Sequence, residues 1–181
     1  MRKNFNTKDM VITALLIALG ILIPTAFSGL RVVLPPAFTA TLTAHVPIVI
    51  AMFISPVSAV LTAIGTTLGF LISGVDLVVT ARAGSHIIFA VVGALMLQKN
   101  VSIVLTGIVT AVLHALCEAL TVFLFLSMGW TVGAESSIYE MAFYVTGIGT
   151  LIHHIIDYII AAALIKALSK TKAVKNVPKL F

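Results

Sequence analysis

Charged side chains are scarce in this sequence. Only 9% of its 181 residues are Asp, Glu, Lys or Arg, whereas 60% are hydrophobic and the mean hydropathy is +1.19. Soluble domains carry about 25% charged residues, so the composition excludes an ordinary water-soluble protein. A chain of this length supplies about six membrane spans of roughly 20 residues each, with little left over. The sequence therefore predicts an all-α integral membrane protein with a single domain over residues 1–181.

The motifs of several common chemistries are missing as well. The single cysteine, Cys117, lies in an apolar run and has no disulfide partner. There is no Gly-x-x-x-x-Gly-Lys-Ser/Thr loop, no His-Glu-x-x-His pair and no Gly-x-Ser-x-Gly elbow. An aromatic content of 8% argues against a large flat ligand such as a flavin. These absences favour a protein that is not an enzyme, uses no cofactor or metal, and needs a partner to supply energy.

Six hydrophobic segments are separated by Gly, Pro and charged residues. They predict a bundle of six transmembrane helices at about residues 9–28, 41–54, 56–74, 80–98, 101–129 and 141–168. The apolar stretch of the first segment continues to Phe27 and five more segments follow, which favours a retained span over a cleaved signal peptide. The second segment is short for a core of about 30 Å, so we expect part of residues 36–44 to extend it beyond the loop at Pro35 and Pro36.

Positive charge is distributed unevenly over the two sides that six spans define. Of the 11 Lys and Arg residues, all except Arg31 and Arg82 fall on the side that holds both termini. The positive-inside rule therefore predicts cytoplasmic N and C termini and outer loops at residues 31–43, 74–80 and 129–140. Because the lysines gather at the chain ends, the net charge of +5 indicates topology and not nucleic-acid binding.

Ionisable residues inside the predicted spans form helical stripes. Each charge at membrane depth costs about 2.5 to 3.5 kcal/mol, so such residues face a bundle interior or a wet cavity. Residues that share a helix face are Arg82, His86, Phe89 and Gly93 in the fourth span, His114, Glu118, Thr121 and Phe125 in the fifth, and Gly147, Thr150, His154 and Asp157 in the sixth. The three stripes predict one binding cavity that opens outward.

Each of these residues also has a structural interpretation. Arg82 could reach the outer headgroups without binding a ligand. Glu118 could form a structural pair with a histidine, and Asp157 could hold helices together. His153 and His154 point in directions roughly 100° apart, so only one of them is expected to face the site.

The chain resembles a known family on several stretches of sequence. Ala14 and Ala18 make a small-x-x-x-small step in the first span, a pattern typical of close helix contacts. Further stretches are a Thr-Lys opening before the run at residues 14–24, His45-Val46-Pro47-Ile48, Met52-Phe53-Ile54-Ser55-Pro56, Gly65-Thr66-Thr67-Leu68-Gly69-Phe70 and Arg82-Ala83-Gly84-Ser85-His86. With the size and the six spans, they make the chain similar to the substrate-binding S components of energy-coupling factor (ECF) vitamin transporters.

That resemblance implies partners and a mechanism. Such proteins are multi-pass cell-membrane subunits of ABC importers that dock on a transmembrane scaffold driven by two cytosolic ATPases. The docking contact would be Ala14 and Ala18, and the subunit would topple in the bilayer to carry its vitamin inward. The site would lie at the outer ends of the last three spans, capped by residues 31–39.

The sequence leaves three small molecules as candidate ligands. Arg82 favours a carboxylate, which niacin and pantothenate both carry, whereas a hydroxymethylpyrimidine would pair with Glu118. The predicted substrate-binding residues are Arg82, His86, Glu118, His114, Thr121, Tyr144, Gly147, His154 and Thr39.

Two other classes of function compete with vitamin binding. A metal or proton pathway would use His114, Glu118, His154 and Asp157 as ligands or relays, and the i, i+4 spacing of the first two suits metal binding. An intramembrane enzyme would use the same residues for acid–base chemistry, but no nucleophile or metal motif supports it.

Overall fold

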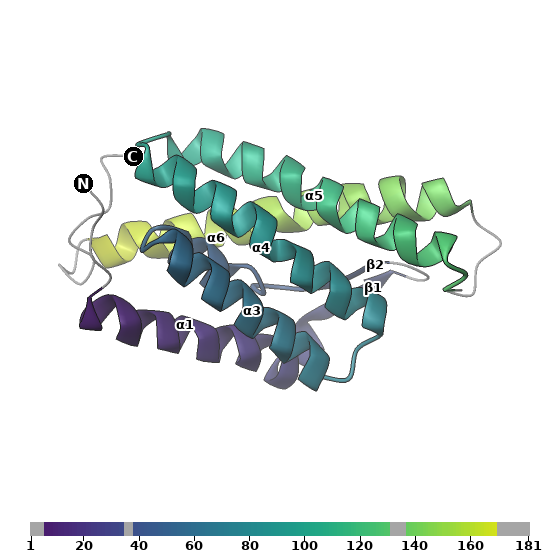
Figure 1. The fold of residues 1–181 in the computed structure, drawn as a ribbon, viewed down its shortest axis with the longest axis horizontal. Helices are drawn as coiled ribbons and strands as arrows, with labels where there is room; N and C mark the ends of the chain where they lie inside the picture. The colour runs from purple at the N-terminus through teal and green to yellow at the C-terminus, as the bar shows by residue number, and fades with distance from the viewer. Residues whose placement is uncertain (1–5, 35–37, 131–136, 170–181) are drawn as a thin grey trace.

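The computed structural model describes residues 6–34, 38–130 and 137–169. These residues form six α-helices, a π-helical segment and a two-stranded hairpin (Figure 1). The elements are α1 (Thr7–Ala26), the 3-10 turn η1 (Ser28–Leu30), β1 (Arg31–Leu34), β2 (Phe38–Thr41), α2 (Val46–Met52), α3 (Pro56–Ile72), α4 (Leu77–Gln98), α5 (Ile103–Ser127), the π-helix η2 (Glu140–Ile148) and α6 (Gly149–Ser169).

Within the described residues, four helical stretches are long and apolar enough to cross a membrane: α1, α4, α5 and the continuous pair η2–α6. The apolar helix α3 is shorter, at 17 residues. Five of the predicted spans agree with these helices to within a few residues, and the prediction of a multi-pass all-α membrane protein is confirmed. The first helix begins where the sequence supplies a capping box, in which Asn6 and Asp9 each accept the other's backbone N–H.

The predicted extension of the second span is wrong. Only the seven residues of α2 are helical there, and at 1.5 Å per residue they cover about 10 Å. The preceding Phe38–Thr41 segment is strand β2, which pairs antiparallel with β1 so that Arg31 lies opposite Thr41. Alternating β-branched Thr residues favour this extended backbone over a helix. The loop expected at Pro35 and Pro36 lies outside the described residues.

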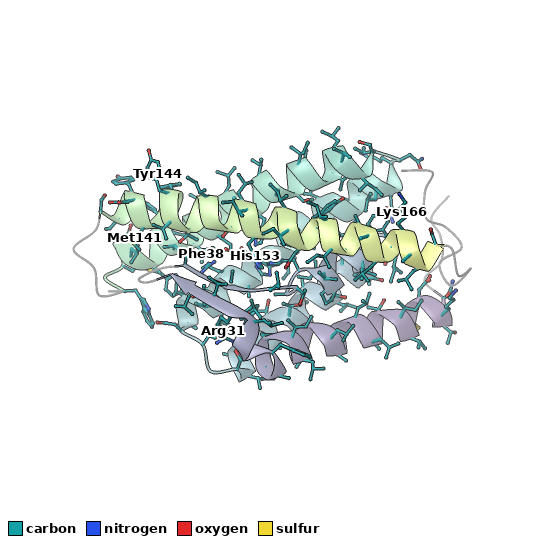
Figure 2. All side chains as sticks on the ribbon, turned by 180° about the vertical axis from the view of Figure 1, so that it is seen from behind. Arg31, Phe38, Met141, Tyr144, His153 and Lys166 are labelled. Atoms are coloured by element: carbon teal, nitrogen blue, oxygen red, sulfur yellow. The ribbon has the colours of Figure 1, made fainter. Side chains whose placement is uncertain are left out.

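The long helices run side by side, and the start of α1 and the end of α6 lie at the same end of the bundle (Figure 1). Lys166 belongs to that end, and Arg31 lies well away from it on the hairpin (Figure 2). Lys8 in the first turn of α1 and Lys99 at the C-cap of α4 complete the basic end. This arrangement matches the charge count; which side faces the cytoplasm stays a prediction.

Helix α1 packs on α3 through glycine. A Cβ atom on Gly69 would lie 2.7 Å from Cα of Ile21, and one on Gly20 would lie 2.6 Å from Oγ1 of Thr66. Glycine is therefore required for this close approach, which explains the glycines of the third span by packing. Ala14 and Ala18 lie on the other, exposed face of α1.

Candidate functional site

Arg82 and Glu118 form a buried ion pair between α4 and α5. Nε and Nη2 of Arg82 donate to Oε2 of Glu118 at 3.1 and 2.6 Å. The arginine is only 3% exposed, so its side chain is covered by the bundle and the hairpin. An arginine inside a membrane bundle is tolerated when a carboxylate compensates its charge, and Glu118 does so here.

Glu118 also joins α6 and two histidines. Thr150 donates its hydroxyl to Oε2, and Nε2 of His86 lies 3.1 Å from Oε1. Nε2 of His114 lies 3.3 Å from the same oxygen. One carboxylate thus holds three helices at a single polar centre, and the structural pairing expected for Glu118 involves an arginine as well as histidines.

All five histidines of the sequence gather around this centre. The ring of His45 lies 4.7 Å from that of His86, 4.5 Å from His114 and 4.7 Å from His153, measured between centroids. His114 and His154 are hydrogen-bonded through their Nδ1 atoms at 2.9 Å. Sequence reasoning did not select His45, because it lies outside the three helical stripes and just ahead of α2.

Asp157 fixes the start of α2 inside the bundle. Its two carboxylate oxygens accept the backbone N–H groups of Thr43 at 2.8 Å and His45 at 3.0 Å. Thr43 has a positive φ of 70°, which is rare for a β-branched residue and needs such a contact to persist. The carboxylate satisfies two N–H groups ahead of α2, one partly buried and one buried, so Asp157 has the structural role that the sequence left open.

The hairpin covers Arg82. The carbonyl of Thr39 accepts from Nη2 of Arg82 at 3.3 Å, and the guanidinium carbon lies 5.7 Å from the centre of the Phe38 ring. Phe38 rests on α6 at Gly149, where a Cβ atom would lie 2.6 Å from the ring (Figure 2). The hairpin is therefore held to α6 by an aromatic contact and to α4 by the arginine.

A small cavity of about 20 Å³ lies beneath the hairpin. It has room for about one water molecule. Its lining residues are Thr39, Ala40, Thr41, Ala44, His45, Phe70, Val79, Arg82, Ala83, His86, Glu118 and His153. A larger apolar hollow of about 550 Å³ lies between α5 and α6, but the residues that line it carry no charge. The polar cavity is the candidate binding site.

Most of the predicted site residues meet at this centre, and three do not. Arg82, His86, Glu118, His114, His154 and Thr39 belong to the network described above. Thr121 instead donates its hydroxyl to the carbonyl of Cys117, and a Cβ on Gly147 would face Ala119 at 3.7 Å. Tyr144 is 68% exposed and points outward from η2 (Figure 2).

Sequence reasoning left three members of the centre off its list. Phe38 comes from strand β2 and His45 from the turn just ahead of α2, in a stretch that was expected to be loop and helix. Thr150 was placed on the polar stripe of the sixth span but was not named as a binding residue.

These features define a multi-pass membrane protein whose buried polar centre lies beneath a hairpin. Over 175 residues the chain is 35% identical to the niacin transporter NiaX of Lactococcus lactis subsp. cremoris (strain MG1363), covering 93% of this chain and 78% of that protein. No protein-family model and no solved structure matches. The chain belongs to the substrate-binding S components of ECF vitamin transporters.

Proposed function

We propose that this S component captures niacin, as the nicotinate anion, and delivers it through an ATP-driven partner module. The similarity to a niacin transporter over 93% of the chain supports the choice of vitamin. The single observation that carries the proposal is the position of Arg82, a buried guanidinium beneath an aromatic ring and beside histidines.

The chemistry of nicotinate suits these groups. Its carboxylate can accept two parallel hydrogen bonds from the guanidinium of Arg82. Its flat ring can pack against Phe38, and its ring nitrogen can accept from an imidazole N–H. Glu118 keeps the guanidinium oriented. Pantothenate shares only the carboxylate, and hydroxymethylpyrimidine has no anion for Arg82.

Binding requires the hairpin to move, because the cavity holds about 20 Å³ and nicotinate is larger than one water molecule. The contacts to be exchanged are the 3.3 Å hydrogen bond from Arg82 to Thr39 and the packing of Phe38. A carboxylate that replaces the Thr39 carbonyl gives Arg82 a second charged partner beside Glu118, and the charge-assisted hydrogen bonds offset the lost contact.

Isothermal titration calorimetry on the detergent-purified protein tests the vitamin. We expect nicotinate to bind and nicotinamide, which lacks the anion, to bind at least about tenfold more weakly, since a charge-assisted hydrogen bond contributes about 1.5 to 3 kcal/mol. Arg82→Gln should lose nicotinate binding, whereas Lys99→Gln at the opposite end of α4 should not. Equal affinities for the two ligands, or tight binding of pantothenate or hydroxymethylpyrimidine alone, would refute the assignment.

The proposed contact with the scaffold is the exposed face of α1 that carries Ala14 and Ala18. Both side chains are exposed, and their larger neighbours Val11, Leu15 and Leu22 are exposed apolar residues too. Small residues let a partner helix approach closely, so this face suits a helix–helix contact within the membrane.

Bulky substitutions test this contact. The double variant Ala14→Trp and Ala18→Trp should abolish niacin uptake in cells and co-purification with the scaffold, while nicotinate binding to the isolated subunit persists. The matched control is Leu124→Trp on the exposed face of α5, which should retain uptake. Normal uptake by the double variant would exclude this face.

A further inference from the structure

Three of the clustered histidines carry ring nitrogens that have no hydrogen-bond partner. These atoms are Nδ1 of His45, Nδ1 of His86 and Nε2 of His114. The residues are 3%, 2% and 0% exposed, so they have no contact with bulk water. An unsatisfied buried polar atom costs about 1 to 3 kcal/mol, and three such atoms in one cluster require an explanation.

The hydrogen bonds of His86 define its tautomer. Its Nε2 lies 3.1 Å from Oε1 of Glu118, which is paired with Arg82 and accepts only. Nε2 therefore carries the proton, and Nδ1 of a neutral ring is left with a free lone pair. A carboxylate that orients the far nitrogen of an imidazole is the usual support of a metal-binding histidine.

His114 is oriented in a similar way. Its Nδ1 is hydrogen-bonded to Nδ1 of His154 at 2.9 Å, and Nε2 of His154 is in turn 3.1 Å from Oγ1 of Thr110. These hydrogen bonds fix the ring, and Nε2 faces Oε1 of Glu118 at 3.3 Å in a geometry that makes no hydrogen bond. Nδ1 of His45 lies 3.1 Å from Oδ2 of Asp157 at an angle that makes no hydrogen bond.

We propose that His45, His86 and His114 bind a divalent transition-metal ion, with Zn²⁺ as the best fit. Each ring offers one nitrogen, and the three nitrogens lie within 4.8 Å of one another. Tetrahedral zinc with bonds of about 2.1 Å needs nitrogens about 3.4 Å apart, so each ring nitrogen has to move by less than about 1 Å. Three neutral imidazoles with one open position are a donor set that zinc uses.

A water molecule in the cavity beneath the hairpin could take the fourth coordination position of the metal. His45 and His86 both line the cavity beneath the hairpin, which has room for one water molecule. A metal at the three histidines would therefore be next to any molecule in that cavity. The two carboxylates of Glu118 and Asp157, against the single guanidinium of Arg82, make the surroundings favourable for a cation.

The test of metal binding needs no vitamin. The protein is purified on a streptavidin-binding tag, because a polyhistidine tag would itself bind metal, then stripped with EDTA and titrated with Zn²⁺ and Co²⁺. We expect one metal per chain and the intense visible bands of tetrahedral Co²⁺. X-ray absorption at the zinc edge of the wild-type protein should show three imidazole nitrogens. Absence of stoichiometric binding, or a shell without imidazoles, overturns the proposal.

Variants identify the ligands. Single Gln substitutions of His45, His86 and His114 should each weaken Zn²⁺ binding by more than the roughly 10–100-fold that the loss of an outer-shell partner costs. His153→Gln is the control, because His153 forms a second possible group only with His45 and Asp157. Loss of metal in His153→Gln with retention in His86→Gln would overturn the assignment. Nicotinate calorimetry with and without EDTA then shows separately whether the vitamin needs the metal.

Discussion

Replacement of Asp157 by Ala should lower the free energy of unfolding far more than replacement of the exposed Asp76 by Ala. The carboxylate is fully buried and accepts the backbone N–H groups of Thr43 and His45 at 2.8 and 3.0 Å. In Asp157→Ala both groups lose their acceptor, the His45 N–H in a buried position and the Thr43 N–H in a partly buried one, and Thr43 keeps its unfavourable φ of 70°. We therefore expect α2 and the hairpin to lose their fixed position.

The magnitude follows from two lost acceptors. Each unsatisfied buried N–H costs about 1 to 3 kcal/mol, so Asp157→Ala should lower the free energy of unfolding by about 4 kcal/mol. Asp157→Asn keeps one acceptor oxygen and turns an NH₂ group toward the other N–H. It should cost about half as much, roughly 2 kcal/mol.

The assay is reversible unfolding in mixed micelles of dodecyl maltoside and SDS. The sequence contains a single tryptophan, Trp130, which packs edge-on to Phe125 and serves as the fluorescence probe. Asp76→Ala is the matched control, because Asp76 is the exposed N-cap residue of α4 and its side chain makes no cap hydrogen bond. A loss below about 1 kcal/mol for Asp157→Ala, or equal losses for both variants, would refute the capping role.

Two further changes probe the packing around the site. Gly149→Ala should push Phe38 away, since a Cβ would lie 2.6 Å from its ring, and should therefore weaken nicotinate binding. Gly84→Ala should leave binding unchanged, because its Cβ would have only an ordinary contact at 3.9 Å. Equal effects of the two variants on binding would contradict the packing argument. Tyr158→Phe should cost about 1 kcal/mol of stability, because its buried hydroxyl donates to a main-chain carbonyl at the start of α5 at 2.9 Å. Tyr144→Phe, at an exposed side chain, should leave stability unchanged in the same unfolding assay; a loss as large as that of Tyr158→Phe would argue against the assignment.

Five of the six helices were predictable because their information is local. Hydrophobic length and the Gly, Pro and charge breaks delimit a membrane helix without reference to its neighbours. The 3.6-residue period likewise predicted that Arg82, His86, His114 and Glu118 face one interior. The same period placed Gly147 on the polar stripe of the sixth span, but Gly147 lies in the π-helix η2, where i→i+5 hydrogen bonds shift the faces out of step.

The amino-acid sequence by itself determined the membrane class, the long helices, the uneven charge at their ends and the set of polar residues that must avoid lipid. Only the tertiary structure decided that residues 38–41 form a strand and that His45 joins the polar centre. The reason is that Asp157, more than 100 positions further along the chain, supplies hydrogen-bond acceptors for the backbone just ahead of α2. These acceptors let the seven-residue helix begin inside the bundle. Such a contact leaves no local pattern in the sequence, because it depends on two segments meeting in space.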